Sequence, residues 1–567
     1  MNINEYEYSD EKKSLFQKLT DICKKLKSNS VFLVIWFILP LLLGTIGYCF
    51  MIGDKSAEIY TPIDALYCSF SLYFINILVQ PYSSSLVGNI LIHICRFYSP
   101  LVTLTGVALL FFNFLSILKN KIREHSKYSV VIYSDEDNIA AIDFWKRLKY
   151  GILSANNKIN KPIKYRSAKN HIIMFDNDID NLTFYAQHKS EMKGNIRIQL
   201  DSLNFINLGT FTDSKSENAN NDNNVAFFSK YEIIAREFWL NLNNLAYIAP
   251  AENKNINIAI PTFNILGKKI FETGLLCNIY SKEQQIEYHI FDDNSLNKSR
   301  YSNFNTMNND EICFHSISDL GNNKELLNNM DLIILTGENE LKLLDYLILF
   351  TSPKTKIFIY MPNNTDISLF YNKTQGENVR ILSFGHPSDI YNVANTLNFD
   401  SYEISKRLNY IYEKKLKYTN ELINNLKNQY DNKLQNEIDE YWSKLNNYHK
   451  SSSISQGEYI KSVNKLLELL KENNKKIDLE QLAEFEHIRW CRFHFLDNWS
   501  YAEEKNTALK RHNCLIPFNQ LDDNIKGYDR ILFDYIKNLH PDLGKQIIWE
   551  WNKIWNYVFY KLAANKR

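Results

Sequence analysis

The sequence contains little glycine, proline or cysteine and carries almost no net charge. Its 567 residues include 17 glycines, 12 prolines and 8 cysteines, and the formal net charge is +1. A near-neutral chain gives no electrostatic reason to expect a nucleic-acid polymer as a partner. The cysteines are scattered and form no CxxC pair, so a disulfide framework is not expected, and this usage is typical of a reducing compartment.

Motifs for catalysis are also absent. The sequence has no nucleophile motif, no metal-protease motif, no kinase signature and no phosphate-binding P-loop. We therefore expect no enzymatic activity and no cofactor.

Two long runs near the N-terminus lack charged residues. Val31–Ile52 has 22 residues and follows a lysine cluster, and Tyr98–Leu118 has 21 residues and ends before Lys119. A helix needs about 20 apolar residues to cross a bilayer, so both runs are predicted to be membrane spans. Basic residues flank the outer ends of both runs, which predicts a multi-pass protein of the cell inner membrane with both termini in the cytoplasm.

The segment between the spans predicts a short re-entrant helix over residues 62–75. Thr61 suits the N-cap, Pro62 the first helical position and Asp64 the first turn. The apolar run that follows is too short to cross and return, and a turn signal begins at Gln80. Backbone that enters and leaves on one side of a membrane is tolerated only inside protein or beside water.

The order of span, short helix, turn and span over residues 31–125 resembles the two-span pore module of the potassium-channel superfamily. Thr61–Tyr67 is similar to the start of that family's pore helix, but Tyr73–Ile77 lacks the glycines of its carbonyl filter, so potassium selectivity is not implied. The alternative is a pair of anchoring helices without conduction. The candidate pore residues are Ser71, Tyr73, Asn76 and Arg96.

Arg96 is the only charged residue between Ala65 and Leu118. A charge in such a segment is costly and usually faces water or a partner. It is either a vestibule charge that disfavours cations or a side chain that reaches the outer interface.

From Ser126 onward, short β-rich runs alternate with helix-length segments, which predicts parallel sheets covered by helices. Two Rossmann-like units are expected, over residues 126–250 and 251–400, split by the polar stretch Ser214–Asn224. The amphipathic segment Tyr231–Phe238 is expected to be a helix at a subunit or domain contact. The expected strands are Val130–Tyr133, His171–Phe175, Ile196–Ile198, Ile256–Ile260, Ile286–Ile290, Leu332–Leu335 and Ile357–Tyr360.

A pore followed by two such units resembles channels with regulator-of-potassium-conductance (RCK) domains, and the resemblance implies domains that dimerise and pull on the pore. The glycine-rich phosphate loop is missing here. The first strand runs into the acidic stretch Asp135–Asp137, and the second unit keeps only Gly267 of the glycine pattern. Acidic groups repel a pyrophosphate, so both units are expected to be scaffolds rather than NAD sites.

Residues 401–475 are predicted to be a helical linker, and residues 476–567 an all-α sensor domain with an aromatic C-terminal helix at Ile547–Tyr560. Five short motifs follow one another in this last part: Leu482–Glu484, His487–Trp490, Asn498–Tyr501, Arg511–Leu515 and Tyr528–Asp529. Their order and spacing resemble the RyR domain, the helical repeat of ryanodine receptors that also occurs in prokaryotic proteins. Asn498 and Ala502 stand where that family usually has glycines, and Asn513 where it often has proline.

The RyR-like segment concentrates aromatic, guanidinium and imidazole side chains. Aromatic faces stack on bases and guanidinium groups hold phosphates, so the set suits a small phosphorylated nucleotide. The alternative is that these aromatic residues form the core of a small helical domain. The candidate ligand-binding residues are His487, Arg489, Trp490, Arg492, His494, Trp499, Tyr501, Arg511 and His512.

Zinc is a competing interpretation of the same segment. Cys491, His494, His512 and Cys514 supply four suitable ligands. His512 and Cys514 belong to the RyR-like pattern, however, and structural zinc sites prefer tight CxxC spacing, so no metal is expected.

Together these features predict a membrane α-helical region with two spans and a re-entrant pore helix, an α/β Rossmann-like RCK tandem and an all-α RyR-like domain. The leading hypothesis is a homotetrameric ion channel in the lipid membrane, opened by a nucleotide messenger such as a cyclic nucleotide or an ADP-ribose derivative. By family analogy alone, it would depolarise the membrane in antiviral defence against phage. The alternative is a membrane-anchored nucleotide-binding regulator or enzyme without a pore.

Overall fold

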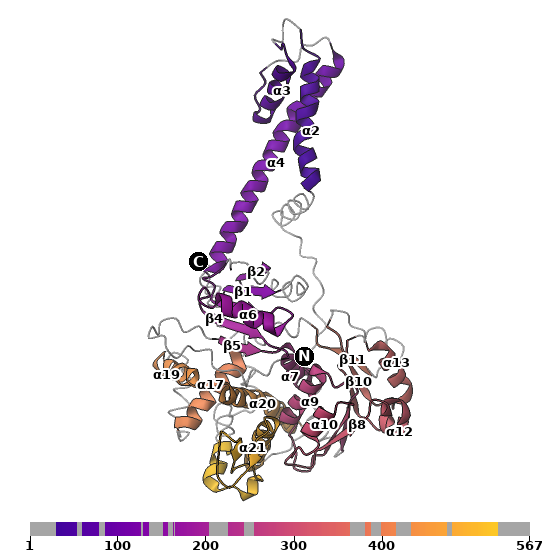
Figure 1. Cartoon of the computed structure of the whole chain (residues 1–567), viewed down its shortest axis with the longest axis vertical. Coiled ribbons are helices and arrows are strands. Elements are labelled where there is room, and N and C mark those ends of the chain that lie inside the picture. The colour runs from indigo at the N-terminus through magenta and orange to yellow at the C-terminus, as the bar shows by residue number, and fades with distance from the viewer. Residues whose placement is uncertain are drawn as a thin grey trace. The chain divides into compact units, whose positions relative to one another are not determined.

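The chain folds into two compact units, Met1–His125 and Ser126–Arg567. Figure 1 labels their helices and strands. The predicted loop Ser214–Asn224 and the predicted aromatic helix Ile547–Tyr560 lie outside the residues that the structure describes. The computed structural model describes residues 30–53, 59–78, 85–125, 129–134, 151–156, 163, 165–202, 225–242, 255–338, 340–362, 380–386, 399–414, 432–472 and 479–530.

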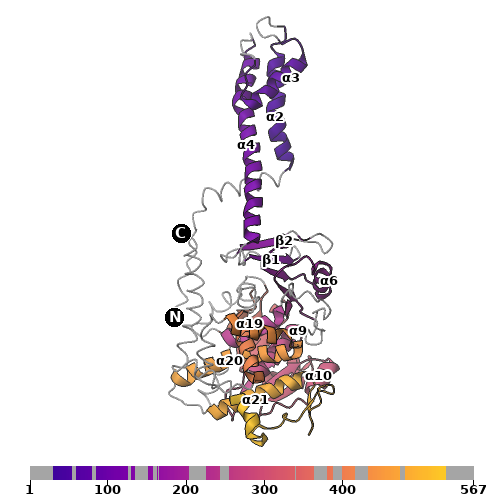
Figure 2. The same cartoon turned by 90° about the vertical axis from the view of Figure 1, so that its left-hand side faces the viewer.

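The first unit is helical. It contains α2 (Ser30–Cys49), α3 (Pro62–Ser71), a 3-10 turn (Leu72–Phe74) and α4 (Leu86–Glu124). Figures 1 and 2 show the three α-helices side by side.

Small residues let α2 and α4 approach closely. A Cβ added to Gly47 would lie 2.9 Å from Ile92 Cγ1, and one added to Gly88 would lie 3.0 Å from the Cβ of Phe50. Small residues at such contacts are typical of helices that pack within lipid, where backbones approach because bulky side chains are absent.

Helix α3 begins as predicted. The Thr61 hydroxyl accepts a hydrogen bond from the Asp64 amide at 3.2 Å, and the Asp64 carboxylate accepts one from the Thr61 amide at 2.8 Å. This reciprocal capping box, with Pro62 in the first turn, fixes the start of the helix. The α-helix ends at Ser71 rather than at residue 75, because the chain tightens into the 3-10 turn.

The outer surface of the first unit is apolar, and polar groups lie inside it. Most large apolar side chains of α2 and α4 are exposed, whereas Tyr48, Ser69 and Ser99 are buried. The Ser69 hydroxyl donates to the carbonyl of Leu41 on α2 at 2.9 Å. This distribution is the reverse of that in a water-soluble helical bundle.

Length and composition single out one helical stretch among the described residues. Leu86–Val107 is long and apolar enough to cross a membrane, and Val34–Cys49 is apolar but shorter. The qualifying stretch starts at Leu86 rather than at the predicted Tyr98, because the apolar run on α4 extends toward the N-terminus past Arg96.

The second unit begins with a five-stranded parallel sheet in the order β2-β1-β3-β4-β5. The helix α6 (Asp178–His188) connects β3 to β4. The predicted strands at β1, β3 and β4 are confirmed. Strands β2 and β5 were not predicted, and both border long polar segments. The strands are β1 (Ser129–Ser134), β2 (Gly151–Asn156), β3 (Asn170–Ile173), β4 (Asn195–Gln199) and β5 (Val225–Phe228).

A six-stranded parallel sheet follows, in the order β11-β10-β9-β6-β7-β8. Numbered along the chain, this is the 3-2-1-4-5-6 order of doubly wound nucleotide-binding folds, with its switch point between β6 and β9. The four predicted strands are confirmed, and β8 and β11 are additional. The strands are β6 (Ile256–Ile260), β7 (Ile286–Phe291), β8 (Glu311–His315), β9 (Leu332–Leu335), β10 (Lys356–Tyr360) and β11 (Ile381–Phe384).

Helices cover this second sheet. Tyr301 of α10 belongs to the core on one sheet face, with Tyr288 and Ile290, whereas Leu344 of α13 belongs to the core on the other face, with Ile333. The helices are α9 (Ile265–Cys277), α10 (Ser295–Tyr301), α11 (Asp319–Asn322), α12 (Lys324–Asn328) and α13 (Leu341–Phe350).

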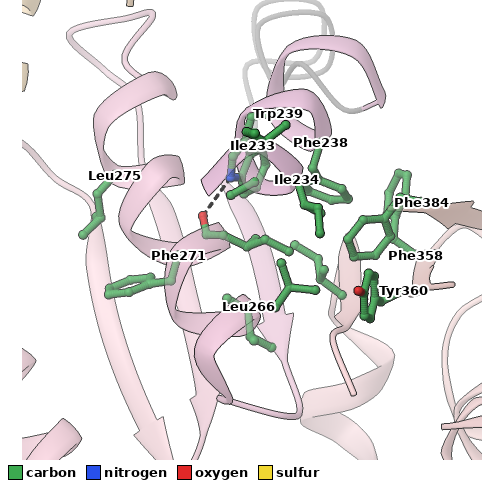
Figure 3. Packing of buried hydrophobic residues seen from close by; sticks show 14 of the residues in the cluster. Ile233, Ile234, Phe238, Trp239, Leu266, Phe271, Leu275, Phe358, Tyr360 and Phe384 are labelled. Atoms are coloured by element: carbon green, nitrogen blue, oxygen red, sulfur yellow. Dashed lines mark hydrogen bonds between the residues drawn. The ribbon is translucent and has the colours of Figure 1, made fainter. Parts of the chain in front are cut away.

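One hydrophobic core joins the two sheets. Helix α7 (Lys230–Glu237) and the π-helical turn Phe238–Leu242 follow β5 of the first sheet but pack on the second. The ring of Phe238 lies 5.0 Å from that of Phe358 and 4.9 Å from that of Phe384. Figure 3 shows these side chains converging with Ile234. The predicted helix at Tyr231–Phe238 therefore lies at a contact between the two α/β parts.

Trp239 fixes this contact. It is buried, and its indole N–H donates to the carbonyl of Ile270 on α9 at 2.8 Å (Figure 3). A Cβ added to Gly274 would lie 3.0 Å from Trp239 Cζ2, so only glycine leaves the ring its present room.

Four helices and a small ladder complete the described chain. Helices α17, α19, α20 and α21 share one core, with residues from each of them buried together, so the described parts of residues 401–475, which are 401–414 and 432–472, belong to a packed helical layer. The elements are α17 (Phe399–Lys414), α19 (Asn432–Ser443), α20 (Asn447–Glu472), α21 (Leu479–Leu496), β12 (Ser500–Tyr501), β13 (Arg511–His512) and a 3-10 turn (Phe518–Gln520).

Replacement of Gly274 by alanine should loosen the joint between the two sheets. The new methyl group would press on the buried Trp239 ring, and overpacking of this kind costs about 1–3 kcal/mol. The free energy of unfolding of the purified protein, from urea titration, measures the loss. Gly321→Ala is the matched control: nothing lies within 4 Å of its added Cβ. An equal effect of both substitutions would contradict this account of Trp239.

Candidate functional site

Helix α21 carries five of the nine predicted ligand-binding residues. Its residues are buried around almost the whole helix circumference, because it packs between α20, α9 and the following loop. Neighbouring candidates on such a helix therefore face different surroundings.

Arg492 faces the second sheet. Its guanidinium donates to the carbonyls of Thr306 and Leu275, both at 2.7 Å, and to the carboxylate of Asp310 at 2.8 Å. Both side chains of the Arg492–Asp310 pair are 0% exposed. The Asp310 carboxylate also accepts the amide of Ile286 at 2.9 Å. The guanidinium thus ties α21 to the start of β7.

Arg489 faces the helical layer. It makes a two-pronged ion pair with Glu486, at 2.8 and 2.7 Å, and donates to the hydroxyl of Ser455 on α20 at 3.1 Å. Gln456 donates to the same Glu486 carboxylate at 2.9 Å. The guanidinium groups of Arg489 and Arg492 are therefore both hydrogen-bonded to partners inside the protein.

His487 is held as an imidazolium. Its Nδ1 lies 3.3 Å from the Asp529 carboxylate, and its Nε2 donates to the carbonyl of Ile516 at 2.8 Å. Burial lowers the pKa of His487, but the hydrogen bonds to Asp529 and Cys491 and the charges of these two residues together outweigh burial and raise the pKa to about 11.

Cys491 lies beside this pair, with its sulfur 3.4 Å from His487 Nε2. The order Cys491, His487, Asp529 is that of a nucleophilic triad, yet the Nε2 proton goes to the Ile516 carbonyl. Burial also raises the pKa of the Cys491 thiol. This cluster therefore does not activate the thiol as a nucleophile.

Four more candidates, Trp490, His494, Trp499 and His512, form one aromatic cluster. The ring of Trp490 lies 4.0 Å from that of His494 and 5.0 Å from that of His512. The ring of Trp499 lies 5.2 Å from that of His494, and Tyr448 of α20 stacks on Trp499 at 5.4 Å. Burial lowers the pKa of His494 to about 3 and that of His512 to about 4, so both rings are neutral near pH 7.

The rim of the cluster is polar and open. Tyr501 on β12 is 54% exposed, and Arg511 on the paired strand β13 is exposed. The charge of Lys505 contributes to the lowered pKa values of His494 and His512, so a cation stands close to the neutral rings. A base could stack at this rim while a phosphate meets Lys505 and Arg511.

Turn geometry explains one departure from the RyR pattern. The Trp499 amide donates to the His494 carbonyl and the Asn498 amide to the Phe495 carbonyl, each at 3.0 Å. This is the Schellman ending of a helix, and its left-handed residue is Asn498, with φ of 61°. Asparagine is tolerated there nearly as well as the family's glycine.

The four proposed zinc ligands do not converge. Within the described residues, no group of three or more histidine, cysteine, aspartate or glutamate side chains could hold a metal ion. His494 instead faces the carbonyl of Trp490 at 2.9 Å, and the Cys491 sulfur lies 4.0 Å from the carbonyl of Cys514.

The candidate pore residues lie at the end of α3, in the turn after it and in the N-terminal third of α4. Ser71 and Tyr73 face inward and bind backbone carbonyls, Asn76 is exposed, and Arg96 is half-buried on α4. Ser71, Tyr73 and Asn76 lie together in one turn, whereas Arg96 lies on another helix.

Hydrogen bonds join the two loops that follow β6 and β9 at the switch point of the second sheet. The Glu340 carboxylate accepts hydrogen bonds from the hydroxyl of Thr262 and from the amide of Gly337, the latter at 3.0 Å. Asn264 donates to the Thr336 carbonyl at 2.9 Å between the same two loops. A carboxylate thus bridges the loops that follow β6 and β9, at the end of the sheet where doubly wound folds bind their ligands.

Sequence reasoning missed several residues of these sites. Asp310, Tyr448 and Glu340 contact predicted residues or join the switch-point loops, but they lie far from the RyR-like motifs along the chain. Asp529 stands in one of the quoted motifs, but it was not among the candidate ligand-binding residues. Glu340 also had a local signal, because it follows the end of a buried strand, where ligand contacts of such sheets gather.

Residues 467–540 match the family model of the RyR domain. The match covers the last six residues of α20, all of α21 and the aromatic cluster apart from Tyr448, and it agrees with the sequence resemblance. A search of curated proteins and a search of solved structures each return no match.

Removal of one partner of the Arg492–Asp310 pair should destabilise the protein strongly. Arg492→Ala leaves a buried carboxylate without its cation, which costs about 3–5 kcal/mol. The control is Lys444→Ala, whose ion pair with Glu440 is exposed and worth about 0.3–0.5 kcal/mol. Urea titration of both variants measures the difference, and near-equal losses would contradict a buried, paired Arg492.

The contribution of His487 to stability should fall as pH rises. Because the folded-state pKa of about 11 lies above the unfolded value of about 6.5, the stabilisation is complete below pH 6.5 and disappears as pH approaches 11. The difference in unfolding free energy between wild type and His487→Gln should therefore be larger at pH 6 than at pH 9. A difference that grows with pH would show that His487 is neutral.

Proposed function

We propose that this protein is the subunit of a ligand-gated ion channel of the cell inner membrane, opened by a small nucleotide-type messenger. The observation that carries the proposal is the inverted polarity of the first unit. Its helices expose apolar side chains, and its hydroxyl groups bind backbone carbonyls inside. In a membrane this arrangement is stable, and in water it is not.

The pore would consist of α2, the re-entrant helix α3 and α4, repeated in a homotetramer. Both termini would face the cytoplasm, where the two α/β parts act as an RCK-like ring. Helix α4 supports this coupling, because it continues without a break to Glu124, five residues before the first strand begins at Ser129.

The messenger site would be the rim of the aromatic cluster in the RyR-like domain. Tyr501 offers an exposed ring for a base, Trp490 and His512 are half-exposed beside it, and Arg511 offers a guanidinium for a phosphate. A cyclic nucleotide or an ADP-ribose derivative has both features. Arg489 and Arg492 would then position the domain instead of touching the ligand, because their donors have internal partners.

The switch point of the second sheet supports placing the messenger in the RyR-like domain. The Glu340 carboxylate bridges the loops at the end of the sheet where doubly wound folds bind their ligands, so the second sheet would transmit the signal without binding a ligand. Opening of a weakly selective pore would depolarise the membrane, an effect suited to antiviral defence.

A second candidate is a membrane-anchored nucleotide-binding regulator without a pore. It is favoured by the finding that one stretch, Leu86–Val107, meets the criterion for a span within the described residues. The oligomeric state of the detergent-purified protein separates the two, since a monomer has no central path for ions.

Ligand binding should depend on the exposed rim. In a thermal-shift screen of the full-length protein against cyclic AMP, other cyclic nucleotides and ADP-ribose, a true ligand should raise the unfolding temperature. Tyr501→Ala should weaken its affinity by about 1–3 kcal/mol, the usual value of one stacked base. Leu509→Ala, in the same exposed loop, is the matched control.

The same ligand should release potassium from proteoliposomes that contain the protein. Binding without release favours the anchored regulator. If no compound binds, or if Tyr501→Ala binds the ligand as tightly as the wild-type protein does, the proposed nucleotide site in the RyR-like domain is wrong.

A further inference from the structure

The turn after α3 contains a strained isoleucine. The Asn76 amide donates to the Ser71 carbonyl and the Ile75 amide to the Leu72 carbonyl, each at 3.2 Å, which is the Schellman ending of a helix. The left-handed position of this motif normally holds glycine, but here Ile75 occupies it with φ of 59°. A β-branched residue in that region is a genuine outlier and costs about 1–3 kcal/mol.

Hydrogen bonds hold the turn in this conformation. The Ser71 hydroxyl lies 2.7 Å from the Cys68 carbonyl and 2.8 Å from the Asn76 carbonyl, and it can donate to either. The Tyr73 hydroxyl donates to the carbonyl of Phe37 on α2 at 2.6 Å, and Thr103 of α4 donates to the Tyr73 carbonyl at 2.8 Å. The turn is therefore anchored to both long helices of the unit.

The anchored turn presents one polar side chain among apolar ones. Phe74 and Ile75 are 67% and 76% exposed, Ile77 and Leu78 are exposed, and Asn76 stands between them. Both main-chain groups of Asn76 are bound to Ser71, so its side-chain amide is the polar group left to face outward.

The irregular backbone of residues 76–78 is incompatible with a position that faces lipid. Residues 76–78 are neither helical nor in a strand. Backbone of this kind survives at membrane depth only when it is covered by protein or lines a water-filled path. The Ser71, Leu72 and Tyr73 carbonyls already accept hydrogen bonds within the chain, so these three carbonyls do not replace the hydration shell of an ion.

We infer that the turn Phe74–Leu78 is the ion-contacting constriction of the pore and that the side chain of Asn76 determines its selectivity. The inference rests on the proposed channel function and on copies of the chain that each contribute one Asn76. An amide has both donor and acceptor groups and no charge, so it solvates cations and anions alike, while Ile75 and Ile77 frame it with apolar surface that favours dewetting. The pore is therefore weakly selective by side-chain chemistry.

Charge substitution at Asn76 tests the inference. Full-length protein in planar bilayers is recorded in a KCl gradient, without ligand and with cyclic AMP or ADP-ribose as probes. Asn76→Asp, which is nearly isosteric, should move the reversal potential toward that of potassium, and Asn76→Lys toward that of chloride. Tyr60→Asp, at the opposite end of α3 and 73% exposed, should leave it unchanged.

Water access gives a second measurement that needs no ligand. Asn76→Cys in proteoliposomes should react with a membrane-impermeant thiol reagent faster than Ile90→Cys on the apolar face of α4, after subtraction of wild-type labelling. Equal labelling of the two cysteine variants, or a reversal potential that does not change with the charge at residue 76, overturns the inference about Asn76. Either result is still compatible with the proposed channel. Absence of current from every protein, wild type included, overturns the channel and the inference with it.

Discussion

The burial of α7 and its π-helical turn against the second sheet is the contact on which the architecture of the second unit depends. The segment belongs in sequence to the first sheet, yet Phe238 and Trp239 complete the core of the second. Two sheets that could have been separate domains therefore share apolar surface that neither can expose without a large loss of stability. The Arg236–Glu458 ion pair, at 2.6 Å, extends the same contact to helix α20.

A second joint, between α21 and the second sheet, has a different chemistry. Arg492 enters a site made of carbonyls and one carboxylate, and its planar guanidinium satisfies each of them. Such a site tolerates little displacement, because a small shift leaves buried polar groups unpaired. The RyR-like domain is consequently attached by directional bonds, and the α/β parts by adaptable apolar packing. A movement of α21 would therefore displace the start of β7 first.

The sequence predicted the elements whose signals are local. The capping box at Thr61 and Asp64, the seven apolar strands and the helix at Tyr231–Phe238 were all evident from pattern. The sequence could not show that Arg489 and Arg492 form buried ion pairs with Glu486 and Asp310, because these pairs exist only in the folded protein. The strands β2, β5, β8 and β11 were missed for a related reason, since their pairing with neighbouring strands, which the sequence does not show, decides whether they form.

The carboxylate of Glu340 at the switch point has a consequence for the stability of the second sheet. A bound ligand stabilises a fold to an extent that depends on the ligand's concentration. The Glu340 carboxylate is covalently part of the chain, so its hydrogen bonds with Thr262 and Gly337 contribute to stability at any concentration of small molecules.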